Sequence, residues 1–215
     1  MHASHPQLRS RTAAWALGFV LLTVAAQVWP GVAAAWQFDR GTYGAGAVWQ
    51  LLTAQWVHWG LLHALANATG FVVLLWAFQR LVAGRLQALA LLGGYAGVAV
   101  VVALDATCMR YAGASGALHG LLAGGALVLC LPVPGRAQAV HRRMRALGGV
   151  VLLGLAAKLV VQHAGATPQV PGWLGFVTYY PAHEAGALGG LLAVLVGYAW
   201  SLRHRPVGPS GAGQQ

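Results

Sequence analysis

The sequence predicts an all-α polytopic membrane protein, folded as a bundle of six transmembrane helices. Of its 215 residues, 58% are apolar and only 7% are charged, whereas a soluble globular domain carries about 25% charged residues. Long uncharged apolar runs recur along nearly the whole chain. Runs of about 20 such residues are long enough to cross a bilayer as helices, so a single helical membrane domain is expected.

The apolar runs place six spans at 12–36, 57–78, 86–104, 114–132, 147–164 and 176–201. We assign 12–202 to the membrane domain, 1–11 to a polar cytoplasmic N-terminal tail and 203–215 to a disordered cytoplasmic C-terminal tail. The segment Val32–Ala35 resembles a signal-peptide cleavage site. The apolar run before it is long for a signal peptide and further spans follow, which favours an uncleaved first helix.

The basic residues predict the orientation of the bundle. With the N-terminus in the cytoplasm, ten arginines fall in cytoplasmic segments, and only Arg40 and Arg110 fall in outer loops. This asymmetry follows the positive-inside rule. It accounts for the net charge of +10, so no nucleic-acid partner is expected. Lys158 is left inside the fifth span, where it either snorkels or faces a cavity, or has a functional role.

The longest outer loop, 37–56, ends in a stretch rich in tryptophan. Trp49 and Trp56 lie in it, close to Trp36 and Trp59. Tryptophans at this depth are most often interface anchors. The alternative is a loop that inserts partly into the outer leaflet and shapes access to the bundle.

A serine and a histidine, each followed by glycines at four-residue spacing, give the main functional signal. Ser115 lies in Gly113-Ala114-Ser115-Gly116 at the start of the fourth span, and His183 lies near the start of the sixth. Small residues every four positions let membrane helices approach closely, and a serine needs a base to become a nucleophile. We therefore expect Ser115 and His183 to meet as a Ser-His dyad. The alternative is that both are structural packing residues.

The chain lacks the residues that other mechanisms of peptide hydrolysis in a membrane would need. A zinc motif of the His-Glu-x-x-His type would need a histidine at 187, where the chain has alanine. Paired aspartates are missing too, because Asp39 and Asp105 both lie at or beyond span ends. Glu184 lies about 100° around the helix from His183. We therefore expect packing, not a carboxylate, to orient the imidazole.

The fourth span is short, about 17 residues or 25 Å from Ser115 to Pro132. A helix that starts below the membrane surface leaves room for water, which hydrolysis requires. The N–H groups at its N-terminus also favour developing negative charge.

Four more polar residues could support this chemistry. His63 and Asn67 share one face of the second span, where they either stabilise an oxyanion or join helices by hydrogen bonds. His119 lies one turn below Ser115, where it either stacks on His183 or only packs. His58 lies nearer the surface and is expected to be structural or gating.

At these residues the chain resembles the rhomboid family of intramembrane serine proteases. The match covers His58, the segment His63–Asn67, the segment Gly113–Gly116, and Ala182-His183 with the glycines that follow. The resemblance implies a six-helix rhomboid-like bundle in a bacterial inner membrane, a catalytic pair of Ser115 and His183, oxyanion support from His63 and Asn67, and no cofactor or metal.

Two segments resemble the rhombosortase branch of that family, namely Leu51-Leu52-Thr53 and Ser115-Gly-Ala-Leu-His119-Gly120. Many other rhomboids carry a tyrosine at the position of His119. The resemblance implies that the partners are membrane-anchored proteins with a C-terminal sorting tail, made of a glycine-rich motif, a hydrophobic helix and basic residues.

Two other functions would explain part of this pattern. A catalytically inactive rhomboid-like protein that binds membrane clients would normally lack the serine or the histidine. A haem-binding membrane cytochrome could use paired histidines among His58, His63, His119 and His183, but would leave Asn67 and the segment Gly113–Gly116 unexplained.

Overall fold

The computed structural model describes residues 6–132, 137–165 and 178–204. These residues are mostly helical and form nine helices and one two-stranded ribbon. Within them, four helices are long and apolar enough to cross a membrane: α5 (Leu61–Phe78), α6 (Gly84–Leu104), α8 (Gln138–Ala164) and α9 (Pro181–Arg203). Two shorter apolar helices accompany them, residues Ala13–Val28 of α1 (Pro6–Val28) and α7 (Ser115–Cys130).

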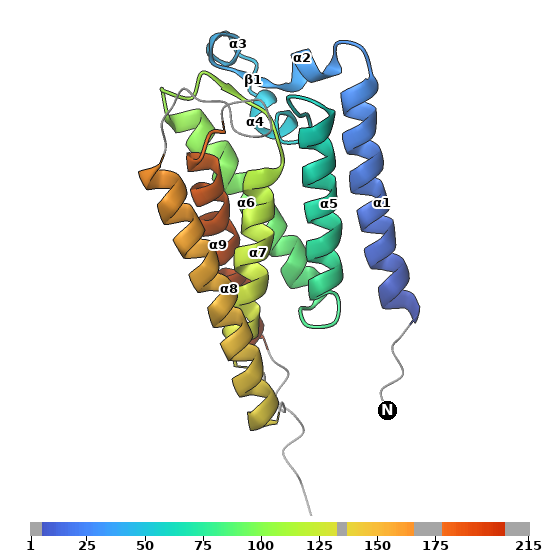
Figure 1. Cartoon of the computed structure of the whole chain (residues 1–215), viewed down its shortest axis with the longest axis vertical. Helices are drawn as coiled ribbons and strands as arrows, with labels where there is room; N and C mark the ends of the chain where they lie inside the picture. The colour runs from blue at the N-terminus through green and yellow to red at the C-terminus, as the bar shows by residue number, and fades with distance from the viewer. Residues whose placement is uncertain (1–5, 133–136, 166–177, 205–215) are drawn as a thin grey trace, which may run out of the picture.

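The helices α6, α7 and α9 form the centre of the bundle and share the most extensive contacts. In Figure 1, α8 runs along α7, and α5 lies between α1 and the central helices. Most residues of α7 are buried. The helix that begins at Ser115 is therefore enclosed by the rest of the bundle.

Glycines allow α7 and α9 to touch backbone to backbone. A Cβ atom added at Gly116 would lie 2.6 Å from the carbonyl oxygen of Ala182, and one added at Gly120 would lie 2.7 Å from the carbonyl oxygen of Gly186. Real Cβ atoms essentially never approach other atoms that closely. The close approach predicted from the glycine spacing is thus confirmed, and it brings the first turns of the two helices together.

Short elements cover one end of the bundle, the upper end in Figure 1. They are α2 (Val32–Trp36), α3 (Arg40–Gly44), α4 (Gln50–Thr53) and a ribbon of β1 (Phe38–Asp39) with β2 (Arg110–Tyr111). The two strands are antiparallel. The ribbon ties the first outer connection to the segment that leads into α7.

Arg40 fastens this cover to the C-terminal end of α6. Its guanidinium donates hydrogen bonds to four carbonyl oxygens, those of Val102, Ala103, Asp105 and Cys108, at 2.6 to 3.2 Å. The last carbonyls of a helix have no partner within it, and a positive charge there also complements the helix dipole. From sequence alone, Arg40 had been identified only as a basic residue of an outer loop.

Several predicted boundaries are corrected. The first span was expected to reach residue 36, but α1 ends at Val28 and α2 is a separate helix. Gly31 between them has φ of +79°, a left-handed conformation that an α-helix cannot continue. Helix α1 begins at Pro6, so part of the expected N-terminal tail is helical. Helix α8 begins at Gln138, nine residues before the predicted span.

Other expectations fall partly outside the described residues. The start of the predicted sixth span, residues 176 and 177, is not described, and neither is most of the expected C-terminal tail. Helix α9 continues to Arg203.

Candidate active site

The turn before α7 is held by hydrogen bonds on both sides. Gly113 has φ of +125°, which favours glycine. Its N–H donates to the carbonyl oxygen of Ala54 at 2.9 Å, and the hydroxyl of Tyr111 donates to its carbonyl oxygen at 2.8 Å. Helix α7 then starts at Ser115. The serine therefore lies at a fixed helix N-terminus, where backbone N–H groups lack partners within the helix.

His183 approaches Ser115 from the first turn of α9. This helix starts at Pro181, a residue whose fixed φ suits the first helical position. The Nε2 atom of His183 lies 2.9 Å from the hydroxyl oxygen of Ser115. The imidazole is 6% exposed. The structure thus brings together the two residues that the sequence singled out in hydrogen-bonding contact, with His183 buried and Ser115 half-buried.

His119 lies directly beside this pair, one turn below Ser115. Its ring stacks on that of His183, with centroids 4.1 Å apart and 12° between the planes. Its Nδ1 atom lies 2.7 Å from the carbonyl oxygen of Ser115, and its Nε2 atom lies 2.7 Å from Nζ of Lys158. Of the two predicted alternatives, His119 takes the stacked one. The exposed side chain of Lys158 contacts its ring.

Besides the stacked ring of His119, a neutral side chain and not a carboxylate contacts His183. The Nδ1 atom of His183 lies 3.2 Å from Oε1 of Gln162 on α8. Glu184 is directed elsewhere and pairs with His163 at 3.0 Å, as its position around the helix had indicated. Sequence reasoning missed Gln162. The available signal was a glutamine four residues after Lys158 in an otherwise apolar span.

His63 and Asn67 lie buried on α5 at the same end of the bundle. A Cβ added at Gly113 would come within 2.9 Å of Nε2 of His63, so this ring borders the turn before Ser115. The amide of Asn67 donates to the carbonyl oxygen of His63 at 2.9 Å, which leaves its second N–H available to another acceptor. His58 meets His63 edge to face, with ring centroids 4.8 Å apart.

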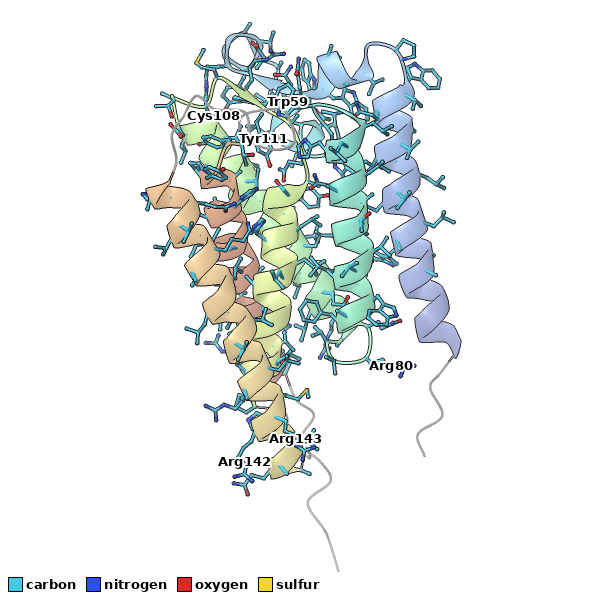
Figure 2. All side chains as sticks on the ribbon, viewed as in Figure 1. Trp59, Arg80, Cys108, Tyr111, Arg142 and Arg143 are labelled. Carbon is cyan, nitrogen blue, oxygen red and sulfur yellow. The ribbon has the colours of Figure 1, made fainter. Side chains whose placement is uncertain are left out.

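The two ends of the bundle differ in composition. Figure 2 shows Arg80, Arg142 and Arg143 at one end, and Trp59 and Tyr111 at the other. Helix α7 starts on the side of Trp59 and Tyr111, below the upper end of α6 (Figure 1). Ser115 therefore lies on the side opposite the arginines, inside the bundle.

A second polar cluster lies around Asp105, just after α6. The hydroxyl of Tyr179 and the hydroxyl and N–H of Thr107 donate hydrogen bonds to the carboxylate of Asp105, just after α6. These bonds, that from Tyr179 above all, hold the pKa of the Asp105 carboxyl below its usual range. Charge on Asp105 thus helps to tie the entry of α9 to the end of α6.

Among the described residues, no group of three or more His, Cys, Asp or Glu side chains is arranged to hold a metal ion. His119 and His183 instead form hydrogen bonds with other side chains and, for His119, with the backbone.

Comparison with known proteins gives one match. Residues 45–200, well over half of the chain, match the family model described as the rhomboid domain. No curated protein and no solved structure matches the chain. The matched segment contains every residue described above around Ser115.

Proposed function

The chain belongs to the rhomboid family, whose members are generally intramembrane serine proteases, and on this premise we propose that it is a serine endopeptidase that cleaves membrane-anchored proteins. Ser115 is the nucleophile and His183 is the general base. The observation that carries this proposal is the 2.9 Å contact between the Ser115 hydroxyl and Nε2 of His183 at a buried helix N-terminus. A multi-pass membrane protein with such a contact has the two groups that acyl transfer requires.

The reaction begins with attack on a substrate carbonyl. Nε2 of His183 accepts the hydroxyl proton while the oxygen of Ser115 bonds to the carbonyl carbon. The carbonyl oxygen becomes an oxyanion, which free N–H groups at the start of α7 stabilise together with the side chains of His63 and Asn67. The proton on His183 then passes to the leaving nitrogen, and the peptide bond breaks to leave an acyl-enzyme.

Water completes the cycle. Nε2 of His183 takes a proton from a water molecule, whose oxygen attacks the ester carbon. His183 then passes this proton to the oxygen of Ser115 as the ester bond breaks, which releases the carboxylic acid and restores both residues. Removing one oxyanion donor, such as Asn67, is expected to lower the rate by about 10²- to 10³-fold.

The site is proposed to open to the periplasmic side of a bacterial inner membrane. Six helices, α1 and α5 to α9, would then span it with the N-terminus in the cytoplasm. The arginines at the opposite end of the bundle (Figure 2) support this orientation, because cytoplasmic connections carry the excess of basic residues.

The substrates are proposed to be secreted or surface proteins with a C-terminal sorting tail. The chain resembles the rhombosortase branch at Leu51-Leu52-Thr53 and at His119. A glycine-rich motif before the tail helix suits the chemistry, because glycine weakens a helix and so exposes its carbonyls to attack.

The two rival functions have less support. An inactive client-binding protein would not need the contact between Ser115 and His183. A haem ligated by His119 or His183 would need a free ring nitrogen there, whereas both ring nitrogens of each have protein partners.

The test is cleavage of a tagged protein that ends in such a tail, co-expressed with the wild type or with Ser115→Ala. We expect cleavage by the wild type and none by the variant at equal expression. Equal cleavage by both would remove Ser115 as the nucleophile. A matched substrate with leucines in place of the tail glycines separates the substrate proposal from the catalytic one, since it should be cut more slowly.

A further inference from the structure

Two polar residues of α8 reach the pair formed by Ser115 and His183. Helix α8 is poorly buried, with Gly148 and Leu155 as its buried residues. Near its outer end, however, Lys158 and Gln162 lie one turn apart and contact each other, Nζ to Oε1, at 3.2 Å. Lys158 also contacts His119, and Gln162 contacts His183. Two residues of an otherwise peripheral helix thus touch both stacked imidazoles.

The chemistry of Lys158 fixes the direction of the hydrogen bonds at His119. An ammonium group has three donors and no acceptor, so Nε2 of His119 must accept from it. A neutral imidazole has one donor and one acceptor nitrogen, so the proton of His119 is on Nδ1. That nitrogen lies 2.7 Å from the carbonyl oxygen of Ser115, which can only accept. Each hydrogen bond from Lys158 through His119 to Ser115 therefore has one donor and one acceptor.

The same reasoning extends through Gln162 to His183. The ammonium of Lys158 selects the amide oxygen of Gln162, because the amide NH₂ could only donate. The oxygen accepts from Lys158 and from Nδ1 of His183, so the proton of His183 is on Nδ1. Its Nε2 atom is left with a lone pair directed at the hydroxyl of Ser115, 2.9 Å away. This is the tautomer that a general base needs.

We propose that Lys158 and Gln162 are positioning residues that set the ring tautomer of His183 and hold its basic nitrogen toward Ser115. This inference rests on the proposed hydrolase function. When His183 takes the proton of Ser115, its ring becomes a cation that donates from both nitrogens, and the amide oxygen of Gln162 accepts one of these bonds. A neutral amide thus fills the place that a carboxylate occupies in a Ser-His-Asp triad.

The local geometry argues against two simpler explanations, a snorkelling Lys158 and an orienting Glu184. A lysine that merely snorkels directs its amine to the headgroups, whereas Nζ of Lys158 donates to His119 and Gln162. Glu184, the carboxylate nearest in sequence to His183, is paired with His163 and is not the orienting group.

The first test reads the tautomers without any substrate. Ring ¹⁵N shifts are measured on ¹⁵N-histidine protein in lipid bilayers, at a mildly alkaline pH where imidazoles are neutral. Loss of signals in His119→Gln and His183→Gln assigns the two rings. We expect both to be protonated on Nδ1 in the wild type. In Gln162→Leu the proton of His183 should move to Nε2. In Lys158→Met the proton of His119 should stay on Nδ1, where the carbonyl oxygen of Ser115 accepts it, and Nε2 of His119 should lose the shift of a hydrogen-bonded acceptor.

The second test measures kcat and KM. Gln162→Leu removes the acceptor, and its kcat should fall by about tenfold or more at unchanged KM, since the lost contact acts on the base and not on substrate binding. Gln162→Glu keeps an oxygen acceptor at the same place and should stay within a few-fold of the wild type. The matched control is Gln138→Leu, at the exposed far end of α8, which should change neither constant.

The outcomes separate this inference from the proposed function. If Gln162→Leu keeps the wild-type tautomer of His183, or keeps wild-type kcat, the positioning role is overturned whatever Ser115 does. If the tautomer of His183 shifts as expected while wild type and Ser115→Ala are equally inactive, the positioning role is supported and the hydrolase proposal fails. Loss of kcat in Gln162→Leu with recovery in Gln162→Glu supports both.

Discussion

The imidazole of His119 lies parallel to that of His183, with ring centroids 4.1 Å apart. Both rings are held at their edges, that of His119 by Ser115 and Lys158, that of His183 by Ser115 and Gln162. The stack restricts the plane of His183, and the edge contacts restrict its rotation within the plane. A second histidine thus provides a flat ring beside His183.

We predict that His119→Ala lowers kcat by about 10- to 100-fold, because a misplaced base loses its alignment with the nucleophile. His119→Tyr restores a flat ring and should recover part of the loss. The comparison is made at equal expression in the same membranes. Wild-type kcat in His119→Ala would show that the stacking is not needed.

The contact between α7 and α9 predicts a strong effect of adding one methyl group. In Gly186→Ala, the new Cβ would collide with the backbone of Gly116, and overpacking of this kind costs about 1–3 kcal/mol. The helices should separate at the level of Ser115, so activity and the free energy of unfolding should both fall. Thermal unfolding in detergent measures the second effect.

Gly154→Ala is the matched control for that experiment. Nothing lies within 4 Å of a Cβ at Gly154, and alanine is the better helix former, so this variant should be neutral or slightly stabilising. Equal destabilisation by both substitutions would contradict the account of the helix contact.

Substitution of Arg40, which lies away from the candidate site, is expected to lower stability. Arg40→Met removes four hydrogen bonds to carbonyl oxygens at the end of α6 and should lower the free energy of unfolding by about 1–3 kcal/mol. Arg40→Lys should recover only part of it, because an ammonium cannot reproduce the planar set of donors.

Arg110, the other outer arginine, serves as its control. Its guanidinium lies 5.2 Å from the ring centre of Trp59, and Arg110→Met should cost less than about 1 kcal/mol. If the two variants unfold at the same temperature, the hydrogen bonds of Arg40 do not stabilise the cover.

The Asp105 cluster predicts a pH dependence of stability. Because the bond from Tyr179 holds the pKa of Asp105 below its unfolded value, its stabilisation is fully present above the unfolded pKa and is lost as pH falls through the folded pKa. Tyr179→Phe should therefore lower the unfolding temperature at neutral pH, and this difference should shrink in acid. A difference that is constant with pH would mean that the carboxylate charge is not involved.

The sequence predicted best what depends on local spacing. Glycines four residues apart mark a helix face whatever surrounds it, so the close approach of α7 and α9 followed from their pattern. The contact of Ser115 with His183 was then expected. The end of α1 also has a local signal, since Pro30 and Gly31 are strong helix breakers, and the predicted first span did not take it into account.

Contacts that depend on how distant elements are placed could not be predicted. Arg40 bonds to carbonyls more than 60 residues away, and nothing in its local sequence indicates the end of α6. Gln162 meets His183 because α8 is rotated to bring that face toward α9, and an apolar helix with few buried residues carries no pattern that fixes this rotation.

The most direct test of the central claim is labelling of Ser115 by a fluorophosphonate, a probe that reacts with activated serines. The protein is labelled in native membranes as wild type, Ser115→Ala and His183→Ala, and the modified peptide is identified by mass spectrometry. We expect a phosphonylated Ser115 in the wild type and none in either variant. Labelling of Ser115 that persists in His183→Ala, or a wild type that is unlabelled while other membrane serine hydrolases react, would contradict it.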